Sequence, residues 1–221
     1  MTRFVEVRVG ELGPGWSLAP ERHGEAPAGA RGKRASGPGM TVPLGSLVTL
    51  VTEPVSPPTA GSAPRSMRVL DTGDALEGFV RAVAIDPAPS FRSMKKRLRP
   101  GDVIVSRLRP YLRQVGLVDA ALFDRPDLEV VASSEFYVLR GEGVAALIPW
   151  LLSAGVQRQL AAAQEGGHHP RVARAVFSAL PVPASLAAHR LDVAARVEGA
   201  VASYRQAEVA MRVLAGEATG W

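Results

Sequence analysis

The middle of the chain reads Leu98-Arg-Pro-Gly-Asp-Val-Ile-Val-Ser-Arg-Leu-Arg-Pro-Tyr-Leu-Arg-Gln-Val-Gly-Leu-Val118, in which two apolar runs flank an arginine-rich segment. Pro100-Gly101-Asp102 is a turn sequence, because proline presets one turn dihedral and glycine tolerates positive φ. The runs at 102–106 and 114–118 are short and rich in β-branched residues, which favour strands. The stretch therefore predicts two strands joined by a loop that presents several guanidinium groups.

Four other runs have the same character and are also bounded by turn residues; they lie at 47–51, 67–70, 129–132 and 135–139. Together the six runs predict a mixed or antiparallel sheet. The segment Phe4-Val-Glu-Val-Arg-Val9 alternates like a half-buried strand. The stretch from Gly24 to Gly39 has almost no large apolar residue, so we predict a loop or linker there.

The apolar period changes near residue 144. From 144 to 163 apolar residues recur at helical spacing, which predicts a helix that ends at Gly166-Gly167. Pro170 suits the first turn of a second short helix, whereas Leu180-Pro-Val-Pro183 must be extended. No proline follows residue 183, and Ser185 is a candidate cap for a long helix.

The segment 184–215 has an amphipathic pattern. Its apolar stripe repeats at spacings of three, four and seven and consists of Ala194, Val197, Val201, Tyr204 and Met211. A long helix must bury such a stripe either against its own domain or against a partner helix. Because coiled-coil seams have this spacing, we expect a partner helix.

These patterns divide the chain into three zones of an α+β protein. Residues 1–40 form an N-terminal extension with one strand and a Gly/Pro/Ala-rich loop, residues 41–183 a mixed-sheet domain with packed helices, and residues 184–221 the C-terminal helix. The 221 residues can bury a substantial core, and 47% hydrophobic residues is ordinary for a globular protein. The charged start and the short apolar runs argue against a signal peptide and a membrane span, so we expect a cytoplasmic protein.

Positive charge is concentrated in one segment. Residues 91–113 hold eight basic residues and one acidic residue, a net +7, whereas the rest of the chain holds 18 basic and 20 acidic residues, a net −2. Such a segment is the electrostatic footprint of phosphate binding. Two other interpretations are a solvated basic face and an arginine preference of the genome, since 23 of the 26 basic residues are arginine.

Candidate nucleic-acid contacts come from three places: a predicted exposed loop before the 102–106 strand, the loop stiffened by Pro110 after it, and a Gly-rich loop at a helix N-terminus, where the dipole favours an anion. They are Lys95, Lys96, Arg97 and Arg99; Arg107, Arg109 and Arg113; and His168, His169, Arg171 and Arg174. Arginine is suited to these roles because its planar fork binds phosphate or guanine through two hydrogen bonds.

Some of these side chains also have structural interpretations. Arg107 can form an ion pair with Asp102 or Glu135, because arginine and carboxylate side chains often pair. Tyr111 can pack in the core as readily as it can contact a ligand. The two adjacent histidines can lie on a solvated loop.

The sequence lacks the motifs of common active sites. The absence of cysteine excludes disulfides, Cys-ligated zinc, iron–sulfur clusters and thiol catalysis. There is no phosphate-binding Gly-x4-Gly-Lys loop, no His-Glu-x-x-His run and no Gly-x-Ser-x-Gly elbow. The carboxylates of Asp71, Asp74 and Glu77 are clustered, but a cluster after a strand is more typical of a turn and helix start. We expect no catalytic site, no metal and no cofactor.

The order of the segments resembles the target recognition domains of specificity subunits in type I restriction–modification systems. The stretch from Leu98 to Val118 is similar to the central motif of that family. Other similar segments are Val42-Pro-Leu-Gly-Ser-Leu47, with Ser46 in place of an acidic residue, Ala132-Ser-Ser-Glu-Phe-Tyr-Val-Leu-Arg140, Gly166-Gly-His-His-Pro-Arg-Val172, Leu180-Pro-Val-Pro183 and the helix at 184–215, which matches the family's spacer helix. The resemblance covers residues 41–215, and the extension at 1–40 departs from the family pattern.

The resemblance implies a protein without an active site of its own. Such a subunit recognises a sequence in double-stranded DNA and holds the methyltransferase subunits there, together with an endonuclease/translocase subunit in some systems, for defence against phage. Standard subunits have two recognition domains and two spacer helices, whereas this chain has length for one of each. The resemblance therefore implies a half-length form that pairs with an identical or a different half, as a coiled coil, through Val197, Val201, Tyr204 and Met211.

Two other functions stay open at this point. One is an assembly module that keeps the fold but does not recognise a DNA sequence, which the spacer-like helix favours. The other is an enzyme with an unrecognised site, such as a small nuclease.

Overall fold

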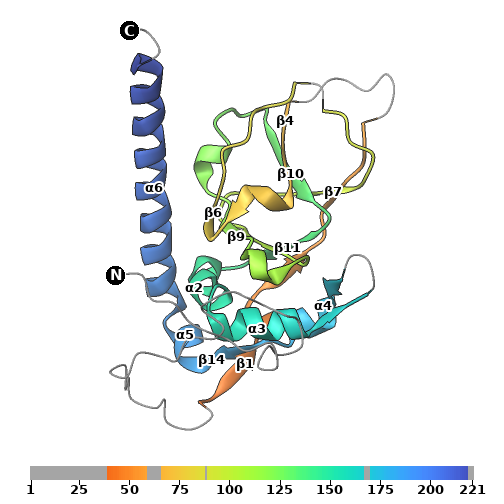
Figure 1. Ribbon diagram of the computed structural model, residues 1–221. Helices are drawn as coiled ribbons and strands as arrows, with labels where there is room; N and C mark the ends of the chain where they lie inside the picture. Colours follow the sequence, from red (N-terminus) through yellow and green to blue (C-terminus); the bar gives the residue numbers. More distant parts are fainter. Residues whose placement is uncertain (1–38, 59–65, 88, 167–169, 219–221) are drawn as a thin grey trace, which may run out of the picture. The chain divides into compact units, whose positions relative to one another are not determined.

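The computed structural model describes residues 39–58, 66–87, 89–166 and 170–218 (Figure 1). From Met40 onward these residues form one compact unit. The strand predicted at 4–9, almost all of the loop predicted at 24–39, and His168 and His169 lie outside the described residues.

A six-stranded mixed sheet forms the centre of this unit. Its strand order is β2 (Thr49–Val51), β11 (Phe136–Arg140), β8 (Val103–Ser106), β9 (Val115–Leu117), β6 (Gly78–Val80) and β5 (Ala75–Leu76). β6 and β9 are parallel, and the other neighbours are antiparallel. All four residues of β8 are buried, because both faces of the sheet are covered.

Successive residues of β8 point into two separate cores, as the period of a strand requires. Val103 and Val105 belong to one core, together with Phe177 from a helix. Ile104 belongs to the other core, together with Leu70 and Phe136. Side chains of β8 therefore contribute to both cores, one on each face of the sheet.

The second core lies against a four-stranded sheet. Its order is β3 (Pro54–Val55), β7 (Lys95–Arg97), β10 (Glu129–Ser133) and β4 (Met67–Leu70), and only the β10–β4 pair is parallel. A two-residue turn leads from β10 directly into β11, so one chain segment crosses from this sheet to the six-stranded sheet. Figure 1 shows the four-stranded sheet on one side of the six-stranded sheet and the short helices on the other.

The helical layer covers the first core. It consists of α1 (Leu44–Leu47), η6 (Val144–Ala146), α2 (Leu147–Leu151), α3 (Ala154–Ala162) and α4 (Arg174–Ser178). Two small antiparallel pairs border it: β1 (Thr41–Pro43) with β14 (Pro181–Pro183), and β12 (Gln164–Glu165) with β13 (Arg171–Val172). The chain then continues through α5 (Ala184–Ala188) into α6 (Arg190–Ala218), the 29-residue C-terminal helix.

The α+β fold with a mixed sheet and a long final helix is confirmed, but several predicted boundaries are wrong. The helix at 144–163 is divided at Ser153, whose extended backbone and hydroxyl cap α3. The segment after Pro170 is strand β13, so the next helix begins only at Arg174. Ser185 lies inside α5 and caps nothing, since Pro183 is the residue that precedes that helix.

The apolar stripe of α6 is divided between two environments. Ala194 and Val201 are buried in the first core and Val197 packs against it, so these residues meet the chain's own domain, one of the two arrangements the sequence allows. The ring of Tyr204 stacks on Phe79 with centroids 3.9 Å apart. Met211 is 66% exposed, so the later part of this apolar stripe does not pack against the domain.

An ion-pair cluster fixes α6 to the six-stranded sheet. The guanidinium of Arg205 donates to Asp119 Oδ2 from Nε at 3.0 Å and from Nη2 at 2.9 Å, and Nη1 donates to Glu208 Oε2 at 2.6 Å. Nη2 also donates to the carbonyl oxygen of Val80. Arg205 is buried, so these four contacts compensate for its lost hydration.

Candidate DNA interface

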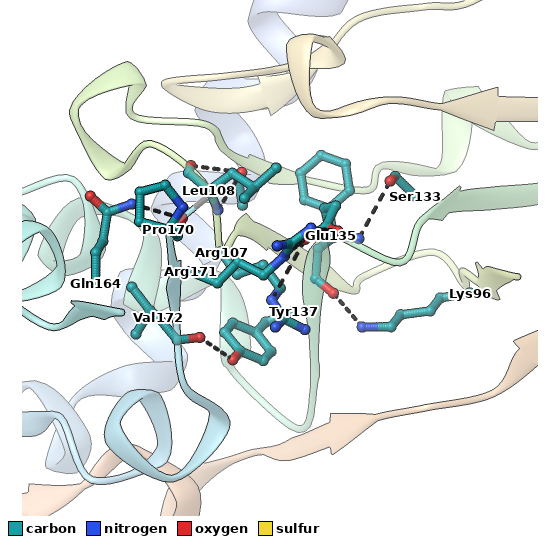
Figure 2. Close-up of polar contacts among 12 residues, drawn as sticks. Lys96, Arg107, Leu108, Ser133, Glu135, Tyr137, Gln164, Pro170, Arg171 and Val172 are labelled. Carbon is teal, nitrogen blue, oxygen red and sulfur yellow. Dashed lines mark hydrogen bonds and ion pairs between the residues drawn. The ribbon is translucent and has the colours of Figure 1, made fainter. Parts of the chain in front are cut away.

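Six polar side chains from distant parts of the sequence gather beside the end of β8, and Figure 2 labels all of them except Arg174. Glu135 lies in the turn between β10 and β11, and the others surround it or the neighbouring strand ends. We call them the Glu135 cluster; its members are Lys96, Arg107, Glu135, Tyr137, Arg171 and Arg174. It holds four cationic side chains and one carboxylate, a net +3.

Backbone hydrogen bonds hold three chain segments together under the cluster. The amide of Arg107 donates to the carbonyl oxygen of Glu135 at 2.9 Å, and the amide of Val172 donates to the carbonyl oxygen of Arg107 at 3.1 Å. Leu108 and Arg171 form an isolated antiparallel bridge. The loop after β8 is therefore clamped between the β10–β11 turn and strand β13.

Arg171 and Glu135 form the strongest polar contact of the cluster. Nε and Nη2 of Arg171 donate to Oε2 and Oε1 of Glu135 at 2.9 and 2.7 Å, which is the bidentate arrangement. Arg107 Nε lies 3.7 Å from the same Oε2. The hydrogen bonds from Arg171 lower the pKa of Glu135 despite its partial burial, so Glu135 is a carboxylate at neutral pH.

Tyr137 supports the two cations next to it. Its hydroxyl donates to the carbonyl oxygen of Val172 at 2.6 Å, and its ring stacks on Phe177 with centroids 4.5 Å apart. Lys96 Nζ lies 5.9 Å and Arg107 Cζ lies 5.7 Å from the ring centroid, within reach of cation–π attraction.

Lys96 is half-buried, and its ammonium donates to the carbonyl oxygen of Phe136. Burial and the nearby positive charges of Arg107 and Arg174 lower the pKa of Lys96. The mutual repulsion that lowers this pKa is the feature that favours an incoming anion.

Solvent reaches the cluster. The side chains of Arg107, Arg171 and Glu135 are 32%, 38% and 24% exposed. Arg174 is also exposed and donates through Nη2 to the carbonyl oxygen of Leu50 at 2.9 Å. A phosphate can therefore approach the cluster without displacing packed side chains.

The loop after Arg107 projects an exposed tip. Its short helix η4 (Pro110–Leu112) is anchored by buried Pro110, whereas Tyr111 is 61% exposed and Leu112 is exposed. Arg109 and Arg113, one on each side, have φ of 44° and 52°, left-handed values that are uncommon for side-chain-bearing residues. Tyr111 therefore does not pack in the core, and the loop is held in a strained shape, which is frequent at functional sites.

The basic segment does not form one surface. The prediction of an exposed loop at 95–99 is wrong for residues 95–97, because they are strand β7 and successive side chains point to opposite faces. Lys95 is buried, with Nζ 3.9 Å from Asp71 Oδ1, and Arg97 forms an ion pair with Glu129 at 3.2 Å. Of the three residues of β7, only Lys96 faces the Glu135 cluster.

Arg99 and Arg113 lie in ion pairs outside the cluster. Arg99 Nη2 donates to Glu53 Oε1 at 2.9 Å, and Arg113 Nε lies 3.3 Å from Glu77 Oε1. Of the structural alternatives for Arg107, the pair with Glu135 is the one observed, while Asp102 pairs with Arg140. Sequence patterns missed Tyr137, although it lies in the Ala132–Arg140 segment that resembles the family.

The carboxylates of Asp71 and Asp74 form a turn, as expected. The two side chains accept each other's backbone N–H groups in a capping box around η3 (Thr72–Asp74). In the described ranges, no three side chains of the metal-binding types come together. Among the helices described there, none is both long and apolar enough to cross a bilayer.

Solved structures similar to the chain include the two that follow, whereas no protein-family model and no curated protein matches it. One is a chain from a structure of the type I R-M system that concerns complex assembly and conformational transition, with a TM-score of 0.54 and 26% identity over 82% of this chain and 46% of that chain. The other is the HsdS subunit from Thermoanaerobacter tengcongensis, with a TM-score of 0.51 and 26% identity over 80% of this chain and 44% of that chain.

This chain thus spans less than half the length of either solved chain. The similarity covers about four fifths of this chain. These similarities support the resemblance to the target recognition domains of type I restriction–modification specificity subunits that the sequence indicates.

Proposed function

We propose that the chain binds duplex DNA and acts as the non-catalytic, sequence-recognising part of a type I-like restriction–modification complex. Its role is to position methyltransferase subunits, and an endonuclease/translocase subunit where the system has one, on the recognised sequence. The observation that carries the proposal is the Glu135 cluster. It is a solvent-accessible group of side chains with a net charge of +3, and it lies at the base of the strained, exposed loop at 107–113.

The cluster and the loop tip have different proposed roles. Lys96, Arg107, Arg171 and Arg174 are spread around one point and suit contacts with successive phosphates, which position a protein on DNA without specifying a sequence. Arg109 and Tyr111 project beyond them and suit contacts with base edges, through bidentate hydrogen bonds or apolar contact with thymine methyl groups. His168 and His169 precede Pro170 and Arg171 in the sequence, and we include them as proposed contacts.

The later part of α6 is the proposed partner surface. Met211, Val209, Val213 and Leu214 are exposed apolar residues beyond the last contact that fixes the helix to the domain. Pairing of two such helices, identical or from two different halves, would join two recognition domains and let them bind two half-sites.

The test of DNA binding measures how the affinity of the full chain for a mixed-sequence 30-base-pair duplex depends on salt. We expect Arg174→Ala to make the logarithmic salt dependence shallower by about 0.9, the value for one lost phosphate contact. The matched control is Arg125→Ala, which removes an arginine paired with Asp127 on another loop. Equal slopes for wild type and R174A would contradict a phosphate-binding cluster.

An assembly module without DNA recognition is the second candidate, and the exposed apolar end of α6 favours it. The same experiment separates the two functions. Wild-type protein that associates through α6 but binds the duplex at no salt concentration would support the assembly module instead.

A further inference from the structure

Glu135 is an acidic side chain at the centre of a surface that is otherwise cationic. Its carboxylate accepts both hydrogen bonds that Arg171 donates and lies 3.7 Å from Arg107. Lys96 and Arg107 also act on its pKa as nearby positive charges. A carboxylate here lowers the net charge of the proposed phosphate-binding surface, so its position calls for a physical explanation.

A carboxylate and a phosphate present similar groups to arginine. Both are oxyanions whose two oxygens match the parallel N–H donors of a guanidinium, and both form charge-assisted hydrogen bonds with it. In the folded chain Glu135 occupies the place relative to Arg171 that a phosphate oxygen pair would take. The protein thus holds an internal substitute for the phosphate ligand.

The backbone fixes this arrangement. Glu135 lies in the two-residue turn between β10 and β11, and the carbonyl oxygen of the same residue accepts from the amide of Arg107. Arg171 is held by the β12–β13 pair and by the bridge to Leu108. Neither partner can move far from the other, so the carboxylate remains a permanent competitor for the guanidinium.

We propose that Glu135 is a positioning residue that restrains non-specific DNA binding, because it orients Arg171 and Arg107 while it offsets one of the four cationic charges of the cluster. Non-specific affinity for DNA comes almost entirely from phosphate neutralisation. Discrimination between a target and other DNA is the ratio of the two affinities, so a weaker non-specific term raises it. This inference rests on the proposed DNA-binding function.

A purely structural ion pair makes a different prediction. If Glu135 only stabilised the fold, its replacement would lower the melting temperature and leave the salt dependence of DNA binding unchanged. If it restrains binding, its replacement frees a cation for one more phosphate contact, which strengthens non-specific binding even when the fold loses stability.

The experiment uses the full chain and the mixed-sequence 30-base-pair duplex. Glu135→Gln keeps the size of the side chain and removes the charge; we expect a salt dependence steeper by about 0.9 and an affinity roughly five- to tenfold higher at 0.1 M salt. The control is Asp127→Asn, which makes the same change in net charge at an exposed ion pair with Arg125. We expect D127N to bind the duplex with the affinity and salt dependence of the wild type.

A charge-neutral double variant provides a second comparison. Arg171→Ala alone should make the salt dependence shallower, because it removes one cation of the cluster and leaves Glu135 with only the more distant Arg107 as a partner. Arg171→Ala combined with E135Q removes one charge of each sign, and we expect its salt dependence to return to that of the wild type. The melting temperature of each variant is measured in parallel.

The outcomes are distinct. If the wild type shows no salt-dependent binding of the duplex, the DNA-binding function itself is wrong. If the wild type binds but E135Q shows the slope and affinity of D127N, or the double variant behaves like R171A alone, the role of Glu135 is overturned while the function stands. A steeper slope for E135Q together with the restored slope of the double variant supports it.

Discussion

Asp102 precedes β8, at the end of the strand opposite to the Glu135 cluster, and its ion pair holds that end in place. It is only 1% exposed, yet its carboxylate accepts from Arg140 Nε at 2.7 Å and Nη2 at 2.8 Å and from the backbone amide of Arg99 at 2.8 Å. Arg140 also donates to Glu53, which links β11 to the segment after β2. Single buried charges are tolerated only when each has such partners.

We expect Asp102→Asn to destabilise the fold by about 3 kcal/mol, because Arg140 loses the charged partner of a buried pair. The measurement is urea denaturation at pH 7. Asp127→Asn removes a carboxylate from an exposed pair, and its effect should stay within about 0.5 kcal/mol. Equal losses in free energy of unfolding for the two substitutions would show that the buried Asp102–Arg140 pair contributes no more to stability than an exposed pair does.

Glu135 should also give the fold a dependence on acid. Hydrogen bonds from Arg171 lower its pKa below the ordinary 4.5, so the folded state binds the proton less readily than the unfolded state. The stabilisation from ionised Glu135 is therefore fully present above pH 4.5 and is lost as the pH falls through the folded-state pKa. The difference in free energy of unfolding between wild type and E135Q should narrow from pH 7 to pH 3; a constant difference would contradict it.

At the scale of elements, the parallel pairing of β6 and β9 depends on a glycine. A Cβ atom added to Gly116 would lie 2.6 Å from the carbonyl oxygen of Phe79, so no side chain fits unless the strands separate. Gly116 pairs with Gly78 in the register of the two strands. The close approach also fixes Phe79, whose ring supports Tyr204 of α6.

Gly116→Ala should therefore cost about 1–3 kcal/mol, the usual range for overpacking a core. Gly199→Ala in α6 is the matched control, since nothing lies within 4 Å of its added Cβ and alanine favours a helix. We expect G199A to raise the melting temperature and G116A to lower it. Both shifts are read from one thermal unfolding experiment.

Local sequence patterns predicted the strands well and the site only in part. Within the run at 102–106, Val103, Ile104 and Val105 are consecutive apolar residues, and a strand buried on both faces needs that pattern whatever its neighbours are. The basic run at 95–97 is a strand because β10 and β3 pair with it, and no local pattern contains those partners. For the same reason the sequence could not predict that Glu135 and Arg171 meet.

On the scale of the whole molecule, α6 lies in two environments along its length. Up to Glu208 it is part of the domain, through the first core, the Tyr204 ring and the Arg205 ion pairs. Beyond Glu208 its apolar side chains are exposed among the described residues. The first part of the helix is thus packed against the domain, and the part after Glu208 presents exposed apolar side chains, which we call the free surface of α6.

We expect the chain to associate through that free surface and Met211→Glu to weaken the association, because the substitution places a charge in an apolar seam. The measurement is mass in solution at micromolar concentration. Gln159→Glu, on the exposed face of α3, adds the same charge elsewhere and should leave the mass unchanged. A wild-type chain that is strictly monomeric would contradict helix pairing.

The pairing of β1 with β14 places Thr41 opposite Pro183, so the recognition domain begins and ends at the same point. The chain thus leaves the domain next to the point at which it enters. The residues between Thr41 and Pro183 can therefore be exchanged for another domain without changing the distance between these two positions. Under the proposed function, exchange of residues 41–183 would exchange the DNA specificity, provided that the replacement keeps the residues that contact α6.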